Sequence, residues 1–255
     1  MQPNYRTPDT NRRSAWDVVF RPFNLYFLTR VVREVMRGSS SAGTDNFYRD
    51  YVEHCGGVLR AVEATGGRVE IFDLGHIPRE PVVFVGNHIS TLETLVLGHI
   101  LRDHGMISFV IKENLMKYPY FKDILRELKC ITVTRTQPAR DLKAILRKGP
   151  ELLKQGISVV VFPQRTRGAF HPEEFNYIGC MLAKRAGVPV VPLALDTRFW
   201  WKGKLISDLG PLRRKIPVRF AFGEPLTLGS DAKEVHRQCV DFIGERLRQW
   251  GAVSG

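Results

Sequence analysis

The order of apolar and polar positions predicts alternating strands and helices from residue 68 onward. Short runs rich in β-branched and apolar residues are typical of strands. These runs are 68–73, 81–86, 107–112, 130–135, 157–162, 188–196 and 215–223. Apolar residues at steps of three and four predict helices between and after them. These helices are 91–105, 120–129, 139–156, 175–187 and 231–250. Because several strands are apolar on both faces, we expect an α/β fold with a mixed, largely parallel central sheet flanked by helices.

The first 66 residues have a different pattern. Residues 1–13 are polar and basic, which predicts a disordered tail. From Ser14 to Arg37, apolar residues recur with helical spacing and arginines lie among them, which predicts a helix broken or kinked at Pro22. The recurring apolar residues are Trp16, Val19, Phe20, Phe23, Phe27, Val31 and Val35. Such a helix either packs on the following domain or lies in a membrane interface, and its aromatic face favours the membrane.

A short polar stretch separates this helix from a second one. Residues 38–44 predict a flexible joint, and residues 45–65 a second helix that the Gly56-Gly57 pair can interrupt. We therefore expect a helical membrane-association segment over 14–66, followed by an α/β domain over 67–255.

The charge narrows the class of partner. Lys and Arg number 38 and Asp and Glu 26, which gives a net charge of +12 and favours an anionic partner. Nucleic acid is not expected, because the basic residues lie in strand-end loops without aromatic RNA-binding motifs. The four cysteines are scattered, which predicts neither a zinc site nor a disulfide framework. No apolar run reaches about 18 residues, so no membrane-spanning helix is expected.

The turn after the strand at 81–86 carries the first candidate chemistry. His88 lies in this turn and Glu93 follows five residues later, in the first turn of the next helix. The two side chains can meet there, and a carboxylate bonded to Nδ1 would leave Nε2 as a general base. An alternative stays open, because Ser90 and Glu93 also have the spacing of a capping box. On that interpretation His88 is an ordinary turn residue.

Polar and basic residues follow several neighbouring strands. Lys112 ends one strand, Arg135 ends the next, and Gln164-Arg165-Thr166-Arg167 follows a third. Carboxyl ends of parallel strands share one edge of a sheet, so these side chains predict an anion site that suits phosphate. The chain has no G-x-S-x-G and no P-loop. A histidine base beside a phosphate site suggests direct attack by a substrate hydroxyl.

Four ordered blocks between about Val69 and Pro225 resemble the lysophosphatidic acid acyltransferase family of glycerolipid acyltransferases. NHISTLE is similar to N-H-x-S-x-x-D, and ITVTR to a strand that ends in D-R. FPQRTRG is similar to F-P-E-G-T-R-S, and VPVVPLAL to the last core strand of the family. Any single block is weak, but the ordered set is specific.

The resemblance implies acyl transfer from acyl-CoA or acyl-carrier protein to the hydroxyl of a lysophospholipid, in phospholipid biosynthesis or remodelling. It implies no cofactor beyond this acyl donor. His88 would be the general base and Glu93 its orienting carboxylate. The resemblance places substrate contacts at Asn87, Ser90, Lys112, Arg135, Gln164, Arg165, Thr166 and Arg167. It also implies peripheral or monotopic attachment to an anionic membrane surface, on its cytoplasmic side.

Three departures from the family pattern put the acceptor in doubt. The carboxylate is Glu93 where the family has Asp, and Thr134 precedes Arg135 where the family has Asp. Gln164 and Arg165 replace the Glu and Gly of the third block, so the loop becomes more positive and we expect a more anionic acceptor or a different lysolipid.

Two other functions stay open. One is a lipid esterase or thioesterase in which His88 activates water, and the other is a non-catalytic lipid-binding protein on the same fold.

Overall fold

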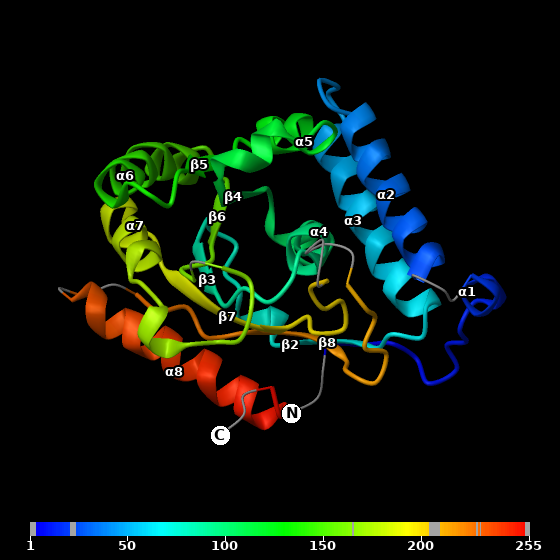
Figure 1. Cartoon of the computed structure of the whole chain (residues 1–255). Coiled ribbons are helices and arrows are strands. Elements are labelled where there is room, and N and C mark those ends of the chain that lie inside the picture. Colours follow the sequence, from blue (N-terminus) through cyan, green and yellow to red (C-terminus); the bar gives the residue numbers. More distant parts are fainter. Residues whose placement is uncertain are drawn as a thin grey trace.

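The computed structural model describes residues 4–20, 24–164, 166–203, 210–227, 229 and 231–252. The strands are β1 (Tyr5–Arg6), β2 (Val69–Phe72), β3 (Val83–Gly86), β4 (Ile107–Lys112), β5 (Ile131–Val133), β6 (Ser158–Val161), β7 (Val190–Asp196) and β8 (Val218–Phe222). The helices are α1 (Ala15–Val19), α2 (Leu25–Ser40), α3 (Phe47–Ala64), α4 (Leu92–Ile100), α5 (Phe121–Glu127), α6 (Pro138–Lys154), α7 (Ile178–Ala186) and α8 (Ala232–Gln249). Strands and helices alternate from β3 to β7, and β8 and α8 follow, as Figure 1 shows.

In the described part of the chain the strands form one sheet in the order β1-β2-β8-β7-β3-β6-β4-β5. β7 and β8 pair antiparallel, as do β1 and β2, and the other neighbouring pairs are parallel. This confirms the expected mixed, largely parallel sheet. The carboxyl ends of β3, β6 and β7 lie side by side at its centre, where α/β sheets place their chemistry.

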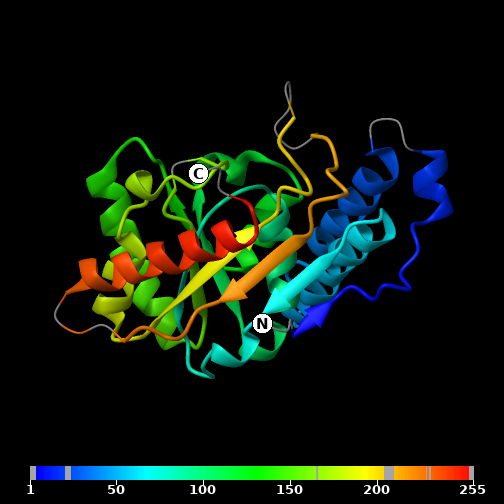
Figure 2. The ribbon, with the colours of Figure 1, turned by 90° about the horizontal axis from the view of Figure 1, so that it is seen from below.

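Two apolar layers sandwich the sheet. Val82, just before β3, and Phe84 in β3 face one layer, while Val83 and Val85 face the other. This explains why the run is apolar at every position. One layer contains core residues of α2, α3, α4 and α5, and the other contains those of α6, α7 and α8. Figures 1 and 2 show the helices on the two sides of the sheet.

The prediction of a disordered N-terminal tail is wrong for residues 4–13. Tyr5 and Arg6 add an antiparallel strand to the edge of β2, and Thr7 is buried. The Thr7 hydroxyl accepts a hydrogen bond from the Val69 N–H at 2.8 Å and donates one to Glu63 at 2.7 Å. The polar side chains that suggested disorder are therefore used to attach this segment to β2 and α3.

The two long N-terminal helices are more regular than the sequence predicts. α2 continues to Ser40, through part of the expected joint, and α3 continues through Gly56 and Gly57. A Cβ atom at Gly56 would lie 2.7 Å from the ring of His99 in α4, and one at Gly57 would lie 2.7 Å from the carboxyl carbon of Glu34 in α2. The glycines therefore permit close packing of three helices instead of ending one.

The apolar residues of the N-terminal segment divide into two sets. Phe27 and Val31 are buried, and the ring of Phe27 packs edge-on against Phe199 and Trp200. α1, by contrast, leaves most of the Trp16 and Val19 side chains in solvent. The inner face of α2 thus follows the packed interpretation, and only α1 and the outer face of α2 are open to another environment. Phe23 and Pro22 lie outside the described residues. Within the described chain, none of the helices combines the length and the apolarity needed to cross a bilayer.

Candidate active site

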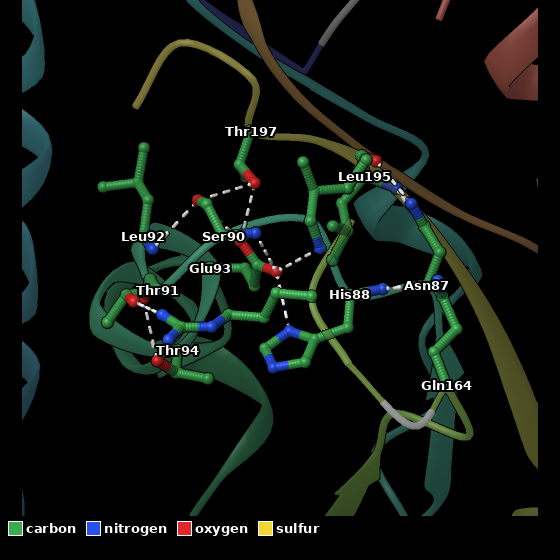
Figure 3. A network of polar contacts seen from close by, with 12 residues as sticks. Asn87, His88, Ser90, Thr91, Leu92, Glu93, Thr94, Gln164, Leu195 and Thr197 are labelled. Atoms are coloured by element: carbon green, nitrogen blue, oxygen red, sulfur yellow. Dashed lines mark hydrogen bonds and ion pairs between the residues drawn. The ribbon is translucent and has the colours of Figure 1, made fainter. Parts of the chain in front are cut away.

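The turn between β3 and α4 is fixed to neighbouring strands by side chains (Figure 3). Asn87 is fully buried, and its amide both donates to the Leu195 carbonyl at 2.8 Å and accepts from the Leu195 N–H at 2.9 Å. The β3–β7 ladder is thereby extended beyond Gly86. α4 then begins at Leu92, with Thr91 as its N-cap residue. His88 is held between these two fixed points, at the carboxyl end of β3.

His88 and Glu93 meet as predicted. The Nδ1 of His88 lies 2.8 Å from Oε1 of Glu93, and its ring stacks on Phe162 with the centroids 4.6 Å apart. An ionised carboxylate only accepts hydrogen bonds, so Nδ1 carries the proton and Nε2 of the neutral ring is left as the acceptor. Nε2 has no partner among the described residues. The imidazole is therefore oriented by Glu93 and Phe162, and its Nε2 is able to take a proton.

Glu93 is fully buried and gathers several donors besides His88. Its Oε1 accepts from the Ile89 N–H at 2.7 Å and the Ser90 N–H at 2.9 Å, and its Oε2 accepts from the Thr197 hydroxyl at 2.6 Å. Burial raises the pKa of this carboxyl, but the hydrogen bond and charge of His88 and the Thr197 hydroxyl outweigh it, so the pKa is lowered overall. Glu93 therefore stays ionised at neutral pH.

The capping-box alternative is correct for Glu93 and wrong for Ser90. Glu93 accepts from the Ser90 N–H as a capping box requires, but Ser90 is not the N-cap residue and its hydroxyl accepts from the Leu92 N–H. The same carboxylate therefore ends the turn and orients the imidazole. The two interpretations of the sequence describe one arrangement.

Three residues expected to contact substrate form bonds within the protein instead. Asn87 and Ser90 are buried in the contacts just described. Gln164 is also buried, with Oε1 accepting from the His88 N–H at 2.8 Å and Nε2 donating to the Ala169 carbonyl at 2.9 Å. The Gln164 side chain is therefore occupied at both ends by contacts within the protein. It joins the loop after β6 to the histidine turn.

The loop after β5 is also built around a carboxylate. Asp141 of α6 accepts from the N–H groups of Thr134 and Arg135, at 2.8 and 2.7 Å. Arg135 is held there with a φ of 64°, a left-handed conformation that non-glycine residues adopt at a cost. The register pairs Lys112 with Val133, so the exposed Lys112 ends the neighbouring strand beside this loop.

Arg135 and Arg167 come near each other although 32 positions separate them in the sequence. Burial and the charge of Arg167 lower the pKa of Arg135, and Asp141 opposes this. Arg167 also donates a hydrogen bond to the Thr91 hydroxyl, at the start of α4. Two cations beside the histidine turn raise the local positive potential, which favours a phosphate. Thr166 is exposed on the same loop, and Arg165 lies outside the described residues.

Three residues that shape the site were not among the predicted ones. Thr197 follows β7 and holds Glu93, Asp141 holds the Arg135 loop, and Phe162 supports the His88 ring. Thr197 and Phe162 lie just after strand ends, as His88 and Arg135 do, so their position was a usable signal. Asp141 gave no such signal, because a carboxylate in the first turn of a helix is commonplace.

The fold and the site define a class: an α/β protein with a histidine prepared for proton transfer beside arginines that suit an anionic substrate. Within that class, the chain belongs to the Acyltransferase family, whose family model matches residues 68–196.

Relatives within this family agree with the match. The chain is 36% identical over 162 residues to the 1-acyl-sn-glycerol-3-phosphate acyltransferase of Pseudomonas aeruginosa, covering 62% of each chain. It is 26% identical over 196 residues to the lyso-ornithine lipid O-acyltransferase of the same organism, covering 71% of this chain and 72% of that one. The crystal structure of the 1-acyl-sn-glycerophosphate acyltransferase PlsC from Thermotoga maritima has the same fold, with a TM-score of 0.67, 21% identity, and coverage of 94% of this chain and 99% of that one.

Proposed function

We propose that the protein is an O-acyltransferase that moves a fatty acyl group from a thioester donor to the hydroxyl of lysophosphatidic acid or a related anionic lysolipid, in phospholipid biosynthesis. The observation that carries this proposal is the His88–Glu93 pair, whose Nε2 is open to substrate. The names of the relatives support the reaction and the acceptor, and acyl-CoA and acyl-carrier protein are both donors of the required type.

The geometry supplies a balanced reaction. Nε2 of His88 takes the proton from the acceptor hydroxyl as its oxygen attacks the thioester carbonyl carbon. The resulting imidazolium is stabilised by the Glu93 carboxylate 2.8 Å away. The tetrahedral intermediate then collapses with loss of the carbon–sulfur bond, and the leaving thiolate recovers the proton from Nε2. The products are an ester and a thiol, with no metal or redox cofactor required.

The arginines favour transfer to a lipid over hydrolysis. Arg135 and Arg167 can hold the phosphate of the acceptor, with Lys112 at the neighbouring strand end. A bound phosphate places the acceptor hydroxyl at a fixed distance from Nε2, and this proximity gives it an advantage over water. An esterase or thioesterase has no need of such a site.

A lysolipid panel tests this function. Purified protein is given palmitoyl-CoA or palmitoyl-carrier protein with lysophosphatidic acid, lysophosphatidylcholine or lyso-ornithine lipid, and the products are identified by mass spectrometry. We expect lysophosphatidic acid to be acylated with a kcat/KM at least about tenfold above the other acceptors, because two arginines are worth more than 1 kcal/mol toward a dianionic phosphate. Preference for a neutral or cationic acceptor would refute the anionic assignment. Release of free fatty acid without lipid product would instead establish a hydrolase.

Peripheral attachment to the cytoplasmic side of a membrane belongs to the same proposal. Trp16, Val19 and Phe20 on α1 are 63%, 66% and 45% exposed. The outer face of α2 adds Val32 and Met36, which are likewise exposed. Aromatic and apolar side chains beside arginines suit the interface of an anionic leaflet, and anionic lipids are characteristic of the cytoplasmic one.

Charged substitutions on α1 are expected to release the protein from vesicles. The variant Trp16→Glu/Val19→Glu/Phe20→Glu should bind phosphatidylglycerol vesicles at least about 100-fold more weakly, because each buried side chain contributes about 1.5–3 kcal/mol. Co-sedimentation measures the change. Tyr177→Glu changes another exposed aromatic residue, at the start of α7, and serves as the control. Unaltered vesicle binding by the α1 variant would contradict the attachment site.

A further inference from the structure

The positive charge of the protein is concentrated on one part of its surface. Residues 112–154 contain eleven Lys and Arg and five Asp and Glu, a net charge of +6, which is half of the +12 of the whole chain. This segment comprises the end of β4, then α5, β5 and α6. β5 is the edge strand of the sheet, so the charge covers one end of the molecule.

The outer face of α6 is the most regular part of this basic surface. Arg140, Lys143, Arg147 and Lys154 are all exposed, and their spacing of three, four and seven places them on one face of the helix. Of the two acidic residues of α6, Asp141 is turned inward, where it holds the loop after β5, and Glu151 is exposed between Arg147 and Lys154. The four basic residues and Glu151 together give this face a net charge of +3. In the described chain, the four basic residues of the α6 face take part in no ion pair. On α8, by comparison, the exposed Arg237 pairs with Glu234.

The α6 face is suited to a soluble partner and not to lipid. Every residue of α6 is described, and none of its large apolar side chains is exposed, whereas interfacial helices insert such side chains. The exposed Trp16, Val19 and Phe20 belong to α1, at the opposite end of the molecule in Figures 1 and 2. The exposed apolar residues of the basic segment, Leu115, Tyr118 and Tyr120, precede α5 and lie outside α6. A helix face with net positive charge and without exposed large apolar side chains is complementary to an acidic protein, which it would steer and orient.

The position of α6 connects its outer face to the catalytic turn. The helix begins five residues after β5, and Asp141 in its first turn fixes the Arg135 loop. Arg135 lies near Arg167, whose neighbour Gly168 donates to the His88 carbonyl at 2.9 Å. A partner that contacts the N-terminal end of α6, beside Arg140, therefore lies near the loop that leads to the His88 turn.

We infer that the outer face of α6 docks an acidic acyl-carrier protein, the thioester donor of the proposed acyl transfer. This inference rests on the proposed function, which left the donor open between the carrier protein and CoA. The carrier binds through its acidic surface, and its long phosphopantetheine arm delivers the acyl thioester past Arg135 to His88. Free acyl-CoA makes no use of this face.

Charge reversal on α6 tests the inference by binding. The variant Arg140→Glu/Lys143→Glu/Arg147→Glu should bind palmitoyl-carrier protein at least about tenfold more weakly than the wild type by fluorescence anisotropy. Affinity of the wild type should fall between about 50 mM and about 200 mM salt. The control Lys233→Glu/Arg237→Glu/Arg248→Glu makes the same charge change on exposed residues of α8 and should stay within about twofold. The milder Arg140→Gln/Lys143→Gln/Arg147→Gln follows if the first variant does not fold.

A donor comparison separates the alternatives. The α6 variant should lose at least about tenfold in kcat/KM with palmitoyl-carrier protein and less than about twofold with palmitoyl-CoA. Equal loss with both donors would overturn the inference in favour of a general phosphate site, and no loss with either would overturn it outright. Parallel loss of phosphatidylglycerol vesicle binding would assign the face to the membrane. Absence of acyl transfer by the wild type would reject the proposed function, and the binding comparison alone would then decide whether α6 docks the carrier.

Discussion

Replacement of His88 by alanine is expected to lower kcat/KM for acyl transfer by about 10⁴-fold, the upper end of the range for removal of a general base. No other described side chain occupies the position that Nε2 holds at the end of β3. The loss should fall on kcat, because the arginines proposed to hold the acceptor phosphate are unchanged. Steady-state kinetics with lysophosphatidic acid at saturating donor measure it.

Two controls give this result its meaning. His171→Ala removes a histidine that is exposed and paired with Glu173, so it should leave the rate unchanged. Circular dichroism and vesicle binding of His88→Ala should match the wild type, because the turn around it is held by backbone contacts to Gln164 and Glu93. Turnover above about a tenth of the wild-type value would show that His88 is not the base.

The second large effect is expected at Glu93. Glu93→Gln should lower kcat by about 10²-fold, since an amide neither fixes the Nδ1 tautomer as firmly nor neutralises the imidazolium. The variant also loses stability, because its NH₂ group faces the N–H donors of Ile89 or Ser90 or the hydroxyl of Thr197. Kinetics well below the melting temperature separate the two effects. If Glu93→Gln only melts earlier and retains its kcat, the carboxylate merely ends the turn.

Thr197 provides a graded comparison for Glu93. Thr197→Val removes one donor to Oε2 and leaves the His88 contact in place, so a loss of about tenfold in kcat is expected, and Thr197→Ser should restore the rate.

Acidification gives a further check on the role of Glu93. Because the pKa of Glu93 is lowered in the folded protein, its stabilising contribution is present above its ordinary value of 4.5 and is lost as the pH falls through the folded-state value. Melting temperatures of Glu93→Gln should lack this component.

The sequence predicted the parts of the site that follow strand ends. Alternation of apolar runs gave the sheet, and the rule that chemistry lies beyond parallel strands brought His88, Arg135 and Arg167 together. Prediction from the sequence is weaker where a polar side chain can contact either substrate or the protein itself. Gln164 lies in a strand-end loop, where a substrate contact is expected. Its amide is instead held by the His88 N–H and the Ala169 carbonyl, and only coordinates reveal such pairs.

The prediction for the N-terminal helices was incomplete for a related reason. Helical spacing identified α1 and α2, but spacing alone does not say whether an apolar face meets protein or lipid. Phe27 is buried against Phe199 and Trp200, residues more than 170 positions away. The pair Gly56-Gly57 predicts an interruption of α3, because nothing local in the sequence shows that α2 and α4 approach α3 there.

The burial of Phe27 and Val31 in the main core bears on how a form of the proposed acyltransferase with less exposed apolar surface can be engineered. Deleting the N-terminal helices would remove the apolar cover of Phe199 and Trp200, so the truncated chain would expose a new apolar surface in place of α1. It is better to keep α2 and to replace only the exposed apolar side chains of α1 by polar ones.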